Sequence, residues 1–557
     1  MLEHIKNEIK WVLQKTFSLD DVVVEEPKKG NADLAIPLFA YAKHYKLSPM
    51  AIYQRFLEVI KTIEGIESIE FINGFMNLSL KREPFAKEVL SQIFEQKEAY
   101  GSSSIGQGKT VVMDYSSPNI AKSFGVGHLR STMIGNALYH IYTKCGYQAI
   151  GVNHLGDWGT QFGKMIVAYR LWGRKEDIQK NPITEMQKLY LRFHEEAENN
   201  PLLEQEARDV FLQLESHDPE ITALWQWFKD ESMKEFMMMY ELLNVHFDSF
   251  HGESFYNDKM ESVVLELNEK GLLKVDEGAT IVDLGDELPP ALIKKSDGAT
   301  LYITRDIAAA LYRYRTYHAD KLLYIVGNEQ ILHFKQLKAV TDLMGYDLDI
   351  EHVNFGLVLI DGKKMSTRSG KFKRLEDVIE NAIEVAKEAI GIKNPHLENK
   401  DHVAKAVGVG AIIFNDLKNE KHLDVDFNLE NMLRFEGQTG PYLQYSSVRI
   451  ESLLKDQSIR LNDLDTRYYQ EDHYFDIIKQ LSMFPTVIQR AQENNAPSVI
   501  ARYILKLAQD FNSFYGKQRI QVEHEGHKQA NLLLVWAIQC VLNEGLRMLG
   551  IEALKEM

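Results

Sequence analysis

The sequence has few cysteines and no long apolar run. Its two cysteines, Cys145 and Cys540, lie far apart and form no Cys-x-x-Cys or Cys/His spacing. This excludes a disulfide framework and a structural zinc site. The longest apolar stretch, 532–538, is too short to span a bilayer, and the charged, amphipathic residues 1–6 are unlike a secretory signal. We therefore expect a cytoplasmic protein that does not associate with membranes.

Positive charge is also scarce. The chain has 64 lysines and arginines against 80 acidic residues, and its formal net charge is -16. Non-specific affinity for nucleic acid comes largely from neutralisation of phosphates by Lys and Arg, so this chain is not a general polyanion binder. Any RNA partner must be met by local basic patches, which occur at 28–29 and 363–374.

The length of 557 residues exceeds what one hydrophobic core usually supports, and about three domains are expected. Residues 1–108 have the pattern of an N-terminal α+β domain, which ends in the Gly/Ser-rich stretch 100–106, a natural linker. Residues 396–557 are helical in pattern almost throughout, and we predict an α-helical bundle there.

The middle region, 109–395, alternates strand-like and helical runs. This alternation predicts a Rossmann-type α/β domain with a doubly wound parallel sheet. The strand candidates are 110–115, 148–153, 321–326 and 353–360. Acidic helical sequence at about 176–290 interrupts the alternation, and we interpret it as a helical insertion between the two halves of the fold.

A glycine motif, Gly-Val-Gly-His at 125–128, follows the first strand candidate and opens a helix with apolar residues at helical spacing. A helix N-terminus offers unpaired amide hydrogens and a partial positive charge, which suit a triphosphate. Gly127 permits close approach of the backbone to a ligand, and His128 can donate a hydrogen bond to a phosphoryl oxygen. On its own, such a tetrapeptide is usually an ordinary strand-to-helix turn.

A basic motif, Lys-Lys-Met-Ser-Thr-Arg-Ser at 363–369, follows the strand-like run 355–360. Alone, a Lys-Lys-Met-Ser segment is more often a solvated loop. The two motifs occur together in this order with strands before both, which makes the pair specific. Together they predict a site where ATP activates a carboxylate.

A third feature concerns the substrate. Tyr302 and Asp306 lie four residues apart in a predicted helix and would share one face. A carboxylate beside an aromatic ring suits a guanidinium, which forms bidentate hydrogen bonds and stacks. The alternative interpretation of this spacing is a helix-capping and packing pair.

Taken together, the motifs resemble those of arginyl-tRNA synthetases, a family of class I aminoacyl-tRNA synthetases. The segment 125–128 is similar to the HIGH motif of that class and 363–367 to its KMSKS loop. Further similar blocks are Ser-Ser-Pro-Asn-Ile-Ala-Lys at 116–122, Leu-Gly-Asp-Trp-Gly at 155–159, Tyr-x-Thr-Arg-Asp at 302–306 and Thr-Gly-Pro-Tyr-Leu-Gln-Tyr at 439–445. The resemblance implies ATP-dependent ligation of L-arginine to its cognate tRNA through an arginyl-adenylate, for protein synthesis. It also implies Mg²⁺ accompanying ATP, no structural metal and a monomer.

Site residues follow from the resemblance, position by position. It implies that the following residues contact ATP: Pro118, Gly125, Val126, Gly127, His128, Lys363, Lys364, Met365 and Ser366. It assigns catalytic roles to Lys122, His128, Lys364 and Ser366, and arginine contacts to Ser117, Asn119, His128, Tyr302, Asp306 and Gln330. The N-terminal domain would bind the tRNA elbow through Phe75 and Asn77, and Tyr442 and Tyr445 would stack on anticodon bases. For these two tyrosines, packing inside a helical core is the alternative.

The sequence departs from the family pattern at two positions. Gly125 stands where the first histidine of the HIGH motif is expected, which removes one possible phosphate donor. Thr367 replaces the second lysine of the KMSKS loop, and Lys122 before the first motif is the residue that compensates in family members of this kind. The rival interpretations are a class I synthetase for another amino acid, a nucleotidyltransferase of the same superfold, and a non-catalytic protein that binds tRNA or arginine.

Overall fold

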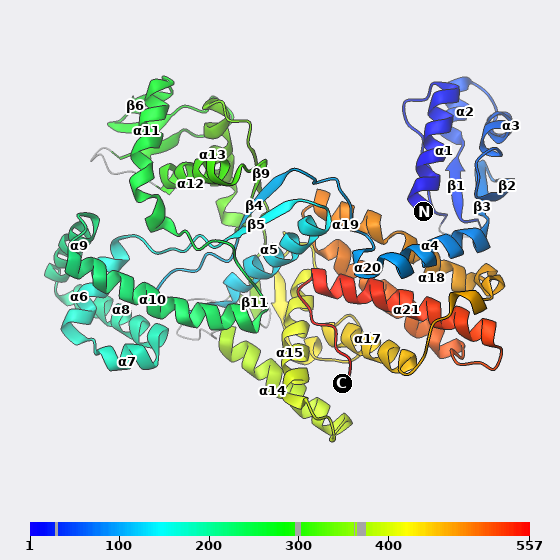
Figure 1. Cartoon of the computed structure of the whole chain (residues 1–557). Coiled ribbons are helices and arrows are strands. Elements are labelled where there is room, and N and C mark those ends of the chain that lie inside the picture. The colour runs from blue at the N-terminus through cyan, green and yellow to red at the C-terminus, as the bar shows by residue number, and fades with distance from the viewer. Residues whose placement is uncertain (28–31, 296–301, 361–362, 365–374) are drawn as a thin grey trace.

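The computed structural model describes residues 1–27, 32–295, 302–360, 363–364 and 375–557. Figure 1 shows a catalytic α/β centre with a helical bundle on one side and a helical insertion on the other. A small N-terminal unit stands apart from the sheet, above the bundle. The predicted fold class, a doubly wound parallel sheet with an N-terminal α+β unit and a C-terminal helical bundle, is confirmed.

The N-terminal unit is an antiparallel sheet in the order β1-β3-β2, packed against helices. Its strands are β1 (Leu34–Pro37), β2 (Ile66–Ile72) and β3 (Phe75–Leu80), and its helices are α1 (Leu2–Phe17), α2 (Phe39–Tyr45) and α3 (Pro49–Ile60). Burial alternates along β3, with Met76, Leu78 and Leu80 in the core. This period of two leaves the intervening side chains, which include Phe75 and Asn77, on the open face.

Helix α4 (Arg82–Gln96) lies along the C-terminal bundle, against α18 and α21 (Figure 1). The stretch after it is packed as well, since the Tyr100 hydroxyl donates to the Leu481 carbonyl at 3.1 Å. By its contacts α4 thus belongs with the bundle, whereas the sequence analysis places it in the N-terminal domain 1–108 with a linker at 100–106. The described N-terminal sheet ends at Leu80.

Asp33 connects the N-terminal unit to the bundle. Its side chain is buried, and it accepts a hydrogen bond from the Leu80 backbone N–H at 2.9 Å. It also lies 3.2 Å from Nζ of Lys479 in α18 and 3.9 Å from the Arg82 guanidinium. One carboxylate therefore joins strand, helix α4 and bundle.

The catalytic sheet has the strand order β10-β9-β4-β5, and neighbouring strands are parallel. The strands are β4 (Thr110–Asp114), β5 (Gln148–Val152), β9 (Lys321–Tyr324) and β10 (Asp349–His352). Alternate residues of β4 enter different cores: Val111 and Met113 pack on the side of α5 (Val126–Lys144), and Val112 packs on the side of α12 (Tyr302–Tyr317). Helix α13 (Ile331–Leu343) connects β9 to β10.

One strand candidate lies in a different sheet from the one predicted. The run 353–360 contains β11 (Val358–Ile360), which pairs with β12 (Lys363–Lys364) and β13 (Val425–Phe427). The outer place in the catalytic sheet belongs to β10. Its sequence, Asp-Ile-Glu-His, has one buried apolar residue, Ile350, because an edge strand needs little apolar surface.

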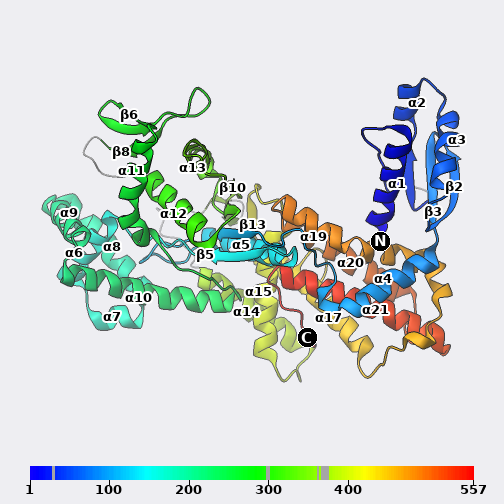
Figure 2. The ribbon, with the colours of Figure 1, turned by 45° about the horizontal axis from the view of Figure 1, so that its top comes forward.

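The insertion begins with helices, which the sequence predicts: α6 (Thr160–Trp172), α7 (Lys175–Lys180), α8 (Pro182–Asn199), α9 (Leu202–Glu215) and α10 (Pro219–Leu242). After η2 (Glu253–Lys259) and α11 (Met260–Glu269) it also contains an antiparallel sheet, β6 (Leu273–Asp276), β7 (Ala279–Val282) and β8 (Ala291–Lys294), which the sequence analysis does not anticipate. Figure 2 shows α6 to α10 at the end of the molecule opposite the N-terminal unit.

The C-terminal region is helical as predicted. Its helices are α14 (Leu375–Lys393), α15 (Lys400–Leu417), α16 (Leu429–Met432), α17 (Gly440–Leu454), α18 (Asp472–Ser482), α19 (Phe484–Glu493), α20 (Ser498–Lys517) and α21 (Glu525–Met548). Among the described residues, no helix combines the length and the apolar character needed to cross a membrane.

Candidate active site

The strand order reverses between β4 and β9, since β5 lies beyond β4 and β10 beyond β9. In open parallel sheets, ligands bind at the carboxyl ends of the strands beside such a switch point. Asp114 ends β4 and Tyr324 ends β9 at this place. The segment 115–125 then leads from β4 into α5.

This connecting segment has an unusual backbone. Ser116, Ser117 and Ala121 have φ values of 71°, 47° and 62°, a region that side-chain-bearing residues seldom adopt. Helix α10 holds the segment in place. The Ser116 hydroxyl lies 2.8 Å from the Tyr240 hydroxyl, and the Ala121 N–H donates to Ser232 Oγ at 3.1 Å. Such strain persists only where surrounding contacts fix it, and it occurs mainly at functional sites.

Ser117 and Asn119 are positioned by neighbours. The Ser117 hydroxyl donates to Asp114 Oδ1 at 2.9 Å. Asn119 forms a bridge with Gly156, whose N–H donates to the Pro118 carbonyl at 3.0 Å. A Cβ at Gly156 would lie 2.2 Å from Asn119 Oδ1, so only glycine allows this approach.

The Leu-Gly-Asp-Trp-Gly block also fastens the insertion. Asp157 is fully buried and accepts hydrogen bonds from Lys229 Nζ at 2.6 Å and from the Ser254 N–H and hydroxyl at 2.8 and 2.7 Å. Its carbonyl accepts from the Trp225 indole at 2.8 Å. This carboxylate therefore joins the sheet to α10, which in turn holds segment 115–125.

His128 stands in the first turn of α5, and its tautomer is fixed. Its Nδ1 accepts a hydrogen bond from the Gly125 N–H at 3.1 Å. Burial, with a further contribution from the charge of Lys122, lowers the pKa of His128 to about 4. The ring is therefore neutral at pH 7, and its proton sits on Nε2, which can donate to a ligand.

Gly127 and Lys122 flank this histidine. A Cβ at Gly127 would meet no atom within 4 Å, so a ligand can approach the backbone there. The Lys122 side chain is exposed, and its charge acts on His128. For Val126 the structure describes the backbone only, at the start of α5.

Asp306 lies on α12 and faces two histidines from other elements. Its Oδ2 is 2.6 Å from Nε2 of His333 on α13, and its Oδ1 is 4.0 Å from Nε2 of His154 after β5. The Asp306 side chain is 26% exposed, so the carboxylate is open on one side. Hydrogen bonding to His333 and the nearby His154 and Arg313 lower the pKa of Asp306 against the opposing effect of burial.

Tyr302 and Gln330 lie near the same opening. Tyr302 is the first residue of α12, one turn before Asp306, and is exposed. Gln330 ends η3 (Asn328–Gln330), three residues before His333, and is also exposed. Because Asp306 and His333 are in contact, both residues are one turn away from that contact, at the starts of neighbouring helices.

A buried ion pair lies behind Asp306. The Arg313 guanidinium donates to Asp114 Oδ2 at 2.7 Å, and both side chains are nearly inaccessible. Arg313 also lies 3.5 Å from His154 Nδ1. Asp114, His154, Arg313 and His333 were missed in the sequence analysis. Asp114 could have been found, because a polar residue at the carboxyl end of a central strand is a candidate ligand contact.

The second motif lies partly outside the described residues. Only the backbone of Lys363 and Lys364 is described, as strand β12 antiparallel to β11, while Met365 and Ser366 fall in the undescribed range. The basic patch at 28–29 and most of the patch at 363–374 lie outside the description as well.

Arg130 links the helix of the first motif to the strands around the second. Its Nε is 2.8 Å from Asp416 of α15, and both side chains are buried. Its other nitrogens donate to the carbonyls of Gly356 at 2.9 Å, Leu423 at 2.7 Å and Lys421 at 3.2 Å. These carbonyls precede β11 and β13, so one side chain joins α5, the bundle and the sheet that carries 363–364.

The predicted tRNA contacts lie on two separate surfaces. Phe75 and Asn77 share the open face of β3, with the exposed Phe39 ring 5.9 Å from Phe75. In the bundle, the Tyr442 hydroxyl accepts from Asn512 at 3.0 Å, whereas Tyr445 is 39% exposed.

A cationic and aromatic surface surrounds Tyr445. The Arg449 guanidinium lies 4.9 Å from the ring centre of Tyr445 and 5.4 Å from that of Tyr515, which is also exposed. The sequence analysis missed Arg449 and Tyr515, because Tyr515 comes from another helix, α20. Alternating rings and guanidinium form a platform on which unpaired bases can stack.

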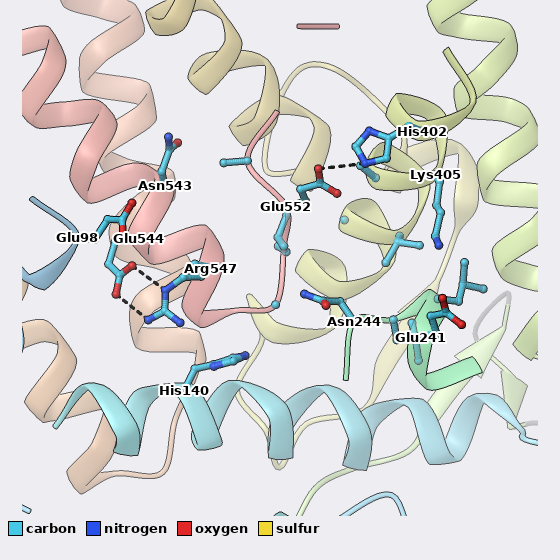
Figure 3. A pocket seen from close by; sticks show the side chains of 18 of the residues that line it. Glu98, His140, Glu241, Asn244, His402, Lys405, Asn543, Glu544, Arg547 and Glu552 are labelled. Atoms are coloured by element: carbon cyan, nitrogen blue, oxygen red, sulfur yellow. Dashed lines mark hydrogen bonds and ion pairs between the residues drawn. The ribbon is translucent and has the colours of Figure 1, made fainter. Parts of the chain in front are cut away.

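A cavity of about 660 Å³ lies elsewhere, between α5, α15, α21 and the last residues of the chain. Figure 3 shows Arg547 paired with Glu544, and His402 with Glu552, along its walls. None of the predicted site residues lines it. The candidate active site is therefore the open region around segment 115–128 and Asp306.

Comparisons with known proteins agree with this site. Residues 89–429 match the profile of the class I (R) tRNA synthetase catalytic domain, 2–80 match the arginyl-tRNA synthetase N-terminal domain, and 443–557 match the DALR anticodon-binding domain. The parallel sheet with its two motifs is thus the catalytic domain of a class I aminoacyl-tRNA synthetase.

Relatives give the particular family. An arginine–tRNA ligase of Exiguobacterium sibiricum is 50% identical over 96% of this chain and 95% of its own length, and one of Enterococcus faecalis is 48% identical over 98% of each. The fold is that of Thermus thermophilus arginyl-tRNA synthetase, with a TM-score of 0.85 at 24% identity over all of both chains. The chain belongs to the arginyl-tRNA synthetase family, which confirms the resemblance and the enzyme class that it implies.

Proposed function

We propose that this enzyme joins L-arginine to its tRNA in two steps at the edge of the sheet. In the first step, a carboxylate oxygen of arginine attacks the α-phosphorus of ATP. The bond to the β-phosphate breaks, pyrophosphate leaves and arginyl-adenylate forms. In the second step, a terminal ribose hydroxyl of the tRNA attacks the activated carbonyl and AMP leaves. Positioning and charge stabilisation suffice for both steps.

The first motif and its flanks would hold ATP. The amide groups at the start of α5 and the neutral Nε2–H of His128 are donors that suit phosphoryl oxygens. Gly127 leaves room for the phosphates, and the exposed Lys122 supplies a charge where pyrophosphate departs. Pro118, Gly125, Val126 and the second-motif residues Lys363, Lys364, Met365 and Ser366 complete the proposed set of ATP contacts.

Arginine would lie between segment 115–125 and the start of α12. Ser117 and Asn119 are fixed in strained or tightly packed backbone and would bind the amino and carboxylate end. Asp306 would bind the guanidinium with one open carboxylate side, and Tyr302 and Gln330 border the same opening. The juxtaposition of His128 and Asp306 at one sheet edge is the observation on which this proposal depends.

Magnesium would enter with ATP. Within the described ranges, no group of three or more acidic, histidine or cysteine side chains could hold a metal ion. Mg²⁺ often binds through substrate phosphates and water rather than through a protein cage. The triphosphate would therefore supply most of its ligands.

The tRNA would contact two surfaces. We propose that Phe75 and Asn77 bind the tRNA elbow and that Tyr442 and Tyr445 bind anticodon bases, with Tyr445 stacking beside Arg449. We further propose that the enzyme works as a monomer in the cytoplasm.

Pyrophosphate exchange with purified protein, ATP, tRNA and each of the twenty amino acids tests this function. Exchange should occur with arginine and be at least about 100-fold weaker with lysine or glutamine, because these side chains cannot form the bidentate pair with Asp306. Asp306→Asn should raise the Michaelis constant for arginine while leaving that for ATP within about twofold. Equal exchange with lysine, or no exchange with any amino acid, would reject the proposal.

A further inference from the structure

The surroundings of the Asp306 carboxylate are asymmetric. Oδ2 lies 2.6 Å from Nε2 of His333, within hydrogen-bond distance. Oδ1 has its nearest imidazole nitrogen, Nε2 of His154, at 4.0 Å, which is beyond that distance. One oxygen is therefore occupied by the protein and the other remains available.

The proton on His154 can be placed. Its Nδ1 lies 3.5 Å from the Arg313 guanidinium, which only donates, so Nδ1 is the acceptor and Nε2 carries the hydrogen. Arg313 is itself held by Asp114 at 2.7 Å. The Nε2–H of a buried, neutral His154 therefore points its positive end toward Oδ1 without a full charge.

We propose that His333 is a positioning residue for arginine selection: its Nε2–H holds Oδ2 of Asp306 so that Oδ1 faces the guanidinium of the substrate. This inference rests on the proposed role of Asp306. His333 comes from α13 and Asp306 from α12, so the hydrogen bond also fixes these two helices at the mouth of the site.

A neutral donor suits this task better than a cation. A permanent positive charge 2.6 Å from the carboxylate would neutralise it and repel the arginine side chain. A neutral imidazole donates one hydrogen bond and leaves the negative charge for the substrate. A carboxylate also has about four lone-pair directions, so one bond from His333 leaves room for a bidentate guanidinium.

Three variants of His333 test the proposal by pyrophosphate exchange at pH 8 in the presence of tRNA. His333→Gln keeps a neutral donor at nearly the same position and should keep the arginine Michaelis constant within about threefold. His333→Leu removes the donor and should raise that constant about 10- to 30-fold, the usual scale for a hydrogen bond to a charged group. His333→Lys adds a permanent charge and should raise it at least as much. The ATP Michaelis constant should stay within about twofold in all three.

His352→Leu is the matched control. His352 also lies at the end of a strand near α13, but it bonds to the Val326 carbonyl at 2.9 Å and not to Asp306. Its replacement should leave the arginine constant nearly unchanged. If His333→Leu fails to fold, the comparison of His333→Gln with His333→Lys decides, and equal arginine constants for these two would overturn the inference.

Asp306→Asn separates failure of this inference from failure of the proposed function. A large effect of Asp306→Asn with a silent His333→Leu would show that Asp306 needs no support from His333, and the inference would be wrong. Silence of both variants would instead remove Asp306 from the arginine site.

Discussion

At the scale of single residues, His128 uses its two nitrogens for different tasks. Nδ1 accepts the hydrogen bond of the Gly125 N–H and so completes the start of α5, which leaves Nε2–H for the ligand. Gly125, at the position where the family motif has its first histidine, thus contributes a backbone hydrogen bond that orients the second one. A side chain was lost at this position, but the tautomer of His128 is still defined.

The titration of His128 can be predicted from its burial. Its pKa is about 4 against an ordinary 6.5, so the unfolded chain takes up the proton first as pH falls. The stability due to neutral His128 is complete above about pH 6.5 and is lost as pH falls toward about 4. Imidazole NMR, with the resonance assigned through His128→Asn, should give a midpoint near 4, and a midpoint near 6.5 would contradict this account.

Gly156 provides a second test at the same scale. Alanine there would place a Cβ 2.2 Å from Asn119 Oδ1 and force the carboxamide to move. Small displacements of substrate-positioning groups are costly, so we expect the arginine Michaelis constant to rise about tenfold or more. Steady-state exchange kinetics measure it. Gly516→Ala in α20, where a Cβ would meet no atom within 4 Å, is the control and should be silent.

At the scale of elements, α5 is held at both ends of its task. Its first turn carries His128, and Arg130 in the next positions bonds to Asp416 and to carbonyls before β11 and β13. Burial raises the pKa of Asp416 and the Arg130 charge opposes this, as expected for a pair removed from water.

Removing one partner of this pair should strongly destabilise the protein. Arg130→Met leaves Asp416 buried without its cation, which costs about 3 to 5 kcal/mol of unfolding free energy. Urea unfolding of the two single variants and the double measures it, and the double should be less destabilised than the sum of the singles. The exposed pair Arg434–Glu430 is the control, with an expected cost below about 1 kcal/mol. Equal effects of the two pairs would contradict the assigned role.

The elements also mark where sequence reasoning succeeds. The motif 125–128, the strand before it and the helix after it are local features, and a local pattern predicts them correctly. Strand β10 was missed because its polar edge sequence carries little apolar signal. His333, His154 and Arg313 escaped notice because their roles depend on contacts between segments far apart in sequence, which no spacing rule reports.

At the scale of the whole molecule, the two proposed tRNA surfaces should be separable from the chemistry. Replacing both Phe75 and Asn77 by alanine removes a ring and a carboxamide from the open face of β3 without touching its core. We expect the Michaelis constant for tRNA in aminoacylation to rise about tenfold, since each lost stacked base contact costs about 1 to 3 kcal/mol. The constants for arginine and ATP should not change.

Two measurements complete that prediction. Phe71→Ala on β2, a neighbouring aromatic residue of the same unit that packs on Tyr53, serves as a stability control. Filter binding of tRNA at several salt concentrations gives the affinity directly. Unchanged tRNA binding by the double variant would remove the N-terminal unit from the proposed interface.

Asp33 gives the whole molecule a fixed length. Its carboxylate joins the end of β3 to Lys479 of the bundle and lies near Arg82 at the start of α4. The open face of β3 is thereby held at a set separation from the sheet edge where the amino acid is activated. We expect the enzyme to act as a ruler, accepting an RNA whose elbow and acceptor end are the right distance apart before any base is read.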